Sequence, residues 1–130
     1  MDQTLAIAND ADVVRARQAV RDLAVRAKMS LVDQTKLVTA TSELARNTLV
    51  YGGGGEVAIS LTEGPRVGIR VVFVDRGPGI PDLDLALTDG WTSGSGMGLG
   101  LSGARRLVDE FDLTTEPGRG TTVGVTKWKR

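Results

Sequence analysis

Residues 71–82 read VVFVDRGPGIPD, and this stretch decides how the rest of the chain is interpreted. Four apolar residues lead to Asp75, so a strand is expected to end at this carboxylate. A carboxylate in that position is poorly solvated and needs a hydrogen-bond donor. Gly77 and Gly79 would let the backbone pass close to a flat ligand, because glycine has no side chain. The stretch is compatible with a ligand site and also with an Asp-Gly-Pro turn that binds nothing.

The segments around this stretch predict a two-layer arrangement. Ser30 and Asp33 resemble a capping box at the start of a helix. Strands joined by short turns are antiparallel neighbours, so we expect an α/β (α+β) two-layer sandwich with helices on one face of a mixed, mostly antiparallel sheet. Strands are expected at 4–9, 56–62 and 66–75 and as a pair within 112–129, and helices at 11–28, from 31 to the glycines at 52–55, at about 82–89, and from 101 through Phe111.

Length and composition limit the possible functions. With 130 residues, the sequence predicts one domain over 1–130. The 16 basic and 16 acidic side chains cancel, so no strong field attracts nucleic acid or a membrane. Cysteine and histidine are both absent, which excludes disulfides, thiolate nucleophiles, histidine bases and autophosphorylation on histidine. No signal peptide or spanning helix is credible, and we expect a cytoplasmic protein.

A carboxylate and a carboxamide share one helix face in SELARNTLVYG, residues 42–52. Glu43 and Asn47 are four residues apart and therefore lie one turn above each other. The Asn oxygen suits a hard cation such as Mg²⁺, and Glu can orient or deprotonate a hydroxyl. The alternative is a solvated face on which Glu43 pairs with Arg46.

Residues 92–103, TSGSGMGLGLSG, are rich in glycine. They contain a formal G-x-G-x-x-G at Gly98, Gly100 and Gly103, but the preceding strand ends about twenty residues upstream, which argues against a dinucleotide site. Glycines before a helix would let backbone N–H groups approach phosphate oxygens. The alternative is a surface loop.

Taken together, DxGxGIP after a strand, ExxxN on an earlier helix and a glycine-rich segment before a later helix resemble the three boxes of the GHKL ATPase and kinase superfamily. The resemblance runs from the Glu43 helix to GTTV near the end, and it implies the Bergerat ATP-binding fold. It also implies that Glu43 is the general base, that Asn47 binds Mg²⁺, and that Asp75 accepts a hydrogen bond from the adenine amino group. The other implied ATP contacts are Gly77 and Gly79 beside the purine, Gly94, Gly96, Met97, Gly98, Leu99 and Gly100 at the phosphates, and Thr121 and Thr122 near adenine.

A separate domain of this size resembles the bacterial anti-sigma-factor serine/threonine kinases, and within them the RsbT-like switch kinases. This implies ATP and Mg²⁺ as cofactors, STAS-domain proteins as substrates, and a PP2C-type phosphatase that some members bind and activate. The segment GSGMGLGLSG is intermediate between the RsbT-like glycine segment and the RsbW-like SGMG form. The alternative is therefore an RsbW-like anti-sigma factor, which sequesters a sigma factor with nucleotide-modulated affinity. An ATPase without a protein substrate is a third reading.

Overall fold

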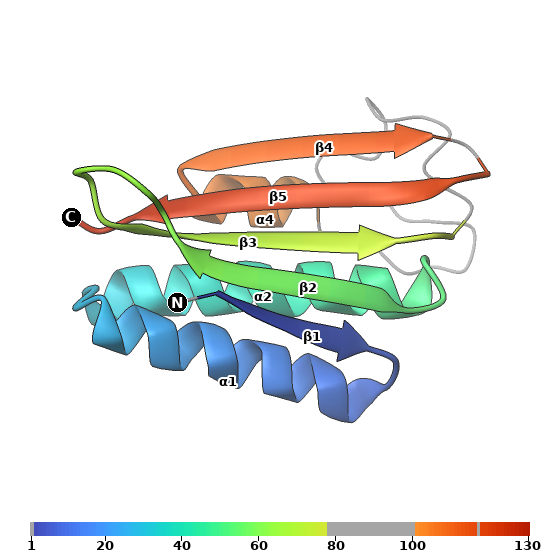
Figure 1. Cartoon of the computed structure of the whole chain (residues 1–130), viewed down its shortest axis with the longest axis horizontal. Coiled ribbons are helices and arrows are strands. Elements are labelled where there is room, and N and C mark those ends of the chain that lie inside the picture. Colours follow the sequence, from blue (N-terminus) through green and yellow to red (C-terminus); the bar gives the residue numbers. More distant parts are fainter. Residues whose placement is uncertain (1, 78–100, 117) are drawn as a thin grey trace.

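The computed structural model describes residues 2–77, 101–116 and 118–130, and in this part of the chain five strands form one sheet (Figure 1). The order across the sheet is β1-β2-β3-β5-β4, and each neighbouring pair is antiparallel. The described sheet is thus more uniform than the mixed sheet that the sequence predicted. The strands are β1 (Gln3–Ile7), β2 (Gly55–Leu61), β3 (Gly68–Asp75), β4 (Glu110–Glu116) and β5 (Gly120–Trp128).

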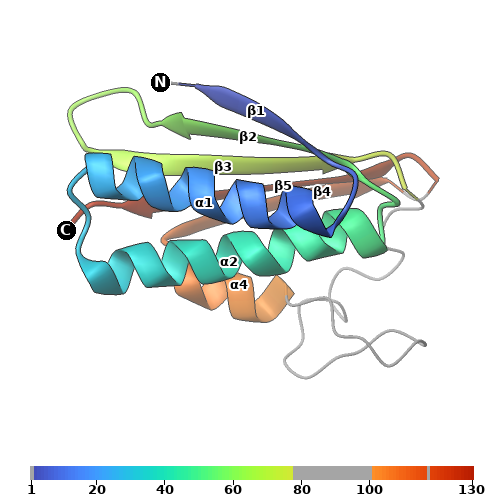
Figure 2. The same cartoon turned by 90° about the horizontal axis from the view of Figure 1, so that it is seen from below.

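Three helices of the described part, α1 (Asp10–Arg26), α2 (Leu31–Val50) and α4 (Leu101–Leu107), lie on the same face of the sheet, with α2 between the other two (Figure 2). Alternate strand residues point toward them and form the core, among them Val57, Ile59, Val71, Phe73 and Val125. The predicted two-layer sandwich is confirmed. None of the helices in the described ranges has an apolar stretch long enough to cross a membrane.

Side-chain caps fix where the two long helices begin. The Ser30 hydroxyl accepts a hydrogen bond from the backbone N–H of Asp33 at 3.1 Å, as the capping-box pattern predicted. Asn9 caps α1 in the same way, because its side-chain oxygen accepts a hydrogen bond from the backbone N–H of Asp12. With Asn9 in this cap, β1 ends at Ile7 and not at the predicted residue 9. These caps set the position of each helix along the sheet.

The prediction for Phe111 was wrong. It was expected at the end of the helix from 101, but α4 ends at Leu107 and Phe111 lies in β4 opposite Val125. The backbone N–H of Asp109 already bonds to the carbonyl of Thr126, so the chain has joined the sheet by this point. Helical spacing of apolar residues therefore continued past the real end of the helix. The helix expected near 82–89 lies outside the described residues.

A buried ion cluster joins α2 to the sheet at the end far from Asp75. The Lys127 ammonium is 3.5 Å from a carboxylate oxygen of Asp33 and 3.5 Å from one of Asp109. Burial alone would raise the pKa of Asp109, but the backbone N–H of Trp128 and the charges of Lys127 and Arg130 lower that pKa below its ordinary value. Asp33 lies in the first turn of α2, and Lys127 pairs with Ile69 at the start of β3. The cluster therefore joins the start of α2 to the sheet, and Asn47 lies near the other end of the same helix.

Candidate nucleotide-binding site

Asp75 ends β3 with a half-buried side chain on the helix-facing side of the sheet. One of its carboxylate oxygens accepts a hydrogen bond from the backbone N–H of Gly77 at 2.9 Å. This bond supplies the donor that the sequence required, and it engages one of the two oxygens. In the sheet, Asp75 lies opposite Gly55 of β2 and Thr121 of β5.

Three glycines surround Asp75 so closely that side chains would not fit. A Cβ at Gly52 would lie 2.4 Å from both Cβ and Cγ of Asp75, and one at Gly77 would lie 2.7 Å from Cα of Gly52. Gly120 has a φ of +114°, and its Cβ would lie 2.1 Å from the carbonyl oxygen of Asp75. Sequence reasoning assigned Gly77 to the site but used Gly52 and Gly120 only as a helix stop and a turn. Their signals, the runs GGGG and PGRG, are visible in the sequence, but what they contact is not.

The end of α2 is tied directly to this glycine-lined position. The carbonyl of Asn47 accepts hydrogen bonds from the N–H groups of Tyr51 at 2.9 Å and Gly52 at 3.2 Å. Gly52 in turn lies against the side chain of Asp75, so Gly52 links the end of α2 to Asp75. The structure therefore brings these two predicted site residues to the same end of the molecule.

Glu43 lies one turn before Asn47, about 6 Å back along the helix axis. Its half-buried side chain lines a cleft between α1 and α2 together with Arg17 and Arg21. Asn47 offers an amide oxygen, which is a ligand type that Mg²⁺ accepts, and Glu43 places a carboxylate one turn away. The described ranges hold no group of three or more acidic side chains placed to bind a metal ion, so a cation here would take its remaining ligands from phosphate and water. The donor set thus fits a nucleotide-bound magnesium ion.

The two predicted threonines lie on opposite faces of the sheet. Thr121 is directly opposite Asp75, is 9% exposed, and shares the helix-facing side with the carboxylate. Thr122 pairs with Val74, so its side chain lies on the face without helices. Only Thr121 is brought next to Asp75.

Comparison with known proteins identifies the family. Residues 32–130 match the model described as histidine kinase-, DNA gyrase B- and HSP90-like ATPase. The chain belongs to this ATPase family. Membership confirms the predicted GHKL resemblance and implies the use of ATP.

Individual relatives of this ATPase domain include protein kinases and anti-sigma factors. The chain is 41% identical to the serine/threonine-protein kinase RsbT of Bacillus subtilis, over 92% of this chain and 90% of the relative. It is 27% identical to an anti-sigma F factor of Thermoanaerobacter, over 87% of this chain and 82% of the relative. Among solved structures, the RsbU and RsbW domains of a Mycobacterium tuberculosis protein match with a TM-score of 0.68 and 22% identity, covering 100% of this chain and 32% of that chain.

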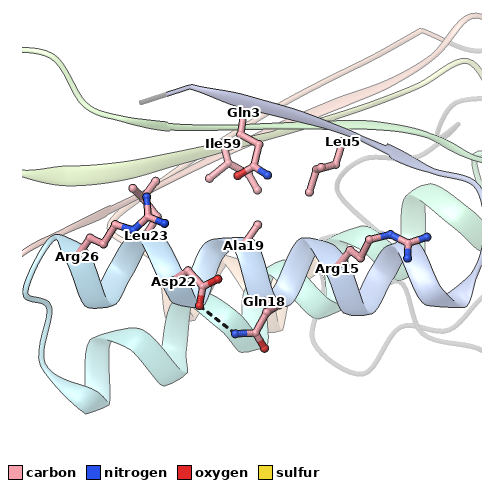
Figure 3. A pocket seen from close by; sticks show the side chains of 9 residues that line it. All are labelled: Gln3, Leu5, Arg15, Gln18, Ala19, Asp22, Leu23, Arg26 and Ile59. Atoms are coloured by element: carbon pink, nitrogen blue, oxygen red, sulfur yellow. Dashed lines mark hydrogen bonds between the residues drawn. The ribbon is translucent and has the colours of Figure 1, made fainter.

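The ATPase domain has a second groove, between β1 and α1 (Figure 3). Leu5, Ala19, Leu23 and Ile59 contribute apolar surface to it, and no residue of the predicted ATP site lines it. The groove therefore shares no residue with the candidate nucleotide site at Asp75. The predicted contacts Gly79, Gly94, Gly96, Met97, Gly98, Leu99 and Gly100 lie outside the described residues.

Replacing Gly52 with alanine should disturb the candidate nucleotide site. The added methyl group would overlap the Asp75 side chain, so either that carboxylate or the end of α2 must move. We expect a loss of about 1–3 kcal/mol in the free energy of unfolding, together with weaker ATP binding. Thermal melts and nucleotide titrations measure the two effects. Gly103→Ala is the matched control, because a Cβ at Gly103 meets no atom of the described residues within 4 Å; equal behaviour of the two variants would contradict the prediction.

Proposed function

We propose that the chain is a Mg²⁺-dependent serine/threonine protein kinase that uses ATP to phosphorylate STAS-domain proteins in a bacterial partner-switching module. The observation that carries this proposal is the 41% identity to the serine/threonine kinase RsbT over almost the full length of both chains. Supporting it, Asp75 and Asn47 lie at one end of the molecule, linked through Gly52.

In the proposed complex, Asp75 recognises the base. One of its oxygens is held by the N–H of Gly77, which leaves the other to accept a hydrogen bond from the adenine amino group. Asn47 would hold the magnesium ion through its amide oxygen. When bound, that ion neutralises charge on the phosphates. Thr121, opposite Asp75, would complete the base contact directly or through a water molecule.

Glu43 is the proposed base for the transfer step. It would take the proton from the substrate hydroxyl as that oxygen bonds to the γ-phosphorus. The bond between the γ-phosphorus and the oxygen bridging to the β-phosphate breaks, and ADP leaves with that electron pair. The chain contains no histidine, so Glu43 is the proposed base and the phosphoryl group passes to the partner protein without a phosphohistidine intermediate.

The proposal is tested by incubating the protein with γ-labelled ATP, Mg²⁺ and the STAS proteins encoded near its gene. We expect label on a serine or threonine of one STAS protein, and none when the label is on the α-phosphate. A PP2C-type phosphatase is the second proposed partner. Its rate of dephosphorylation, measured with and without this protein and in the absence of ATP, tests whether the protein binds and activates it. If ATP binds and no STAS protein is labelled, the kinase proposal fails.

The second candidate is an anti-sigma factor whose affinity for a sigma factor depends on the nucleotide. The 27% identity to an anti-sigma F factor over 87% of this chain favours it. Affinity capture from the native cell separates the two candidates. Recovery of a sigma factor, with neither a STAS protein nor a phosphatase, would favour the anti-sigma factor.

A further inference from the structure

Three polar side chains form a row across the sheet at the proposed base site. Asp75 of β3 lies opposite Thr121 of β5, and Thr121 lies opposite Thr115 of β4. All three side chains are on the helix-facing side, because each continues the alternation of the core residues in its strand. The hydroxyl oxygens of Thr115 and Thr121 are 3.0 Å apart, and the Thr115 hydroxyl is 3.2 Å from the carbonyl oxygen of Gly120.

The protons in this row can be assigned from donor and acceptor chemistry. The carbonyl of Gly120 can only accept, so the Thr115 hydroxyl donates its single proton there. Thr115 then has only lone pairs for Thr121, so Thr121 must donate to Thr115. This is the arrangement that satisfies both contacts. It turns the Thr121 proton toward β4 and leaves that hydroxyl with lone pairs for the side of Asp75.

We propose that Thr115 is a positioning residue that sets the nucleotide selectivity of the site by orienting the Thr121 hydroxyl. With Thr121 oriented in this way, Asp75 and Thr121 present acceptors only. A 6-amino purine supplies the matching donor, directly or through a water that donates to both side chains, whereas a 6-oxo purine brings another acceptor. The inference rests on the proposed ATP site and adds Thr115 to it, a residue on β4 that contacts the base only through Thr121.

Removing the Thr115 hydroxyl frees the Thr121 proton. In Thr115→Val, whose side chain has nearly the same shape, Thr121 can rotate and donate toward the base, which favours a 6-oxo group. Inosine triphosphate differs from ATP at the 6-position and at the protonation of the neighbouring nitrogen, so it reports on this edge of the purine. We expect the preference for ATP over ITP to fall about three- to tenfold, the worth of one hydrogen bond.

The test measures dissociation constants of ATP and ITP for the wild type, Thr115→Val and Thr115→Ser. The serine variant keeps the hydroxyl and should keep the wild-type ratio. Thr114→Val is the matched control, since Thr114 is the neighbouring exposed residue on the opposite face of the same strand. If the valine variant does not fold, Thr115→Ala replaces it. In a Thr121→Val background, Thr115→Val should leave the ratio unchanged, because the hydroxyl that it orients is gone.

The outcomes separate this inference from the proposed function. A wild-type protein that binds no ATP overturns both. A wild type that prefers ATP, with the same ATP-to-ITP ratio in Thr115→Val, overturns the role of Thr115 alone. The role of Thr115 is also overturned if Thr115→Val lowers the selectivity as much in the Thr121→Val background as in the wild type. A purely structural role for Thr115 would lower the affinity for both nucleotides together and leave the ratio unchanged.

Discussion

Glu43→Gln is expected to lower the rate of phosphoryl transfer by about 10²–10⁴-fold, the usual contribution of a positioned general base. Glutamine has almost the same shape as glutamate, but its amide does not accept the proton of the attacking hydroxyl. ATP should still bind with nearly unchanged affinity, since Asp75 and Asn47 are intact. The measurements are the rate of label transfer to a STAS protein at saturating ATP and the dissociation constant of ATP.

The control for this variant is Glu63→Gln, which makes the same change at an exposed residue in the β2–β3 connection. Undiminished transfer by Glu43→Gln would exclude the base role. Glu43 also lines the cleft that contains Arg17 and Arg21, so a second outcome is informative. A variant with normal turnover and a raised KM for the STAS protein would make Glu43 a docking residue and not the base.

Much of the fold could be predicted because its signals are local. Alternation in β2 and β3, the capping residues Asn9 and Ser30, and the GGGG run at the end of α2 each act within a few residues. Phe111 shows the limit of this reasoning. Its spacing fits a helix, but the pairing of β4 with β5, which depends on residues 120–128, decides its structure.

The sequence supplied candidate site residues, but it did not show how the fold holds them together. Residue types and spacing identified Asp75, Asn47 and Glu43 as candidates. The contact between Gly52 and Asp75 joins residues 23 positions apart, and no periodicity in the sequence reports it. The same holds for Thr115, which looks like one of several strand threonines until β4 is paired with β5. Close approach and strand register are tertiary properties, and they were missed for that reason.

Asp75→Asn is expected to weaken ATP binding by about 10- to 100-fold. The N–H of Gly77 requires an acceptor, so the amide oxygen of the substituted side chain would take that position and its NH₂ group would face the base. There the NH₂ group meets the adenine amino group, which is also a donor. The 6-oxo group of ITP would find a partner in the same NH₂, so the preference for ATP over ITP should fall further than in Thr115→Val and can reverse.

Titration of both nucleotides checks this prediction, with Asp22→Asn, an exposed change on α1, as the control. Unchanged ATP affinity in Asp75→Asn would remove Asp75 from the base site. If Thr115 orients a hydroxyl that shares the base with Asp75, combining Asp75→Asn with Thr115→Val should cost less selectivity than the sum of the separate losses, because both act on one acceptor edge. Strict additivity would mean that Asp75 recognises the base without help from the threonine row.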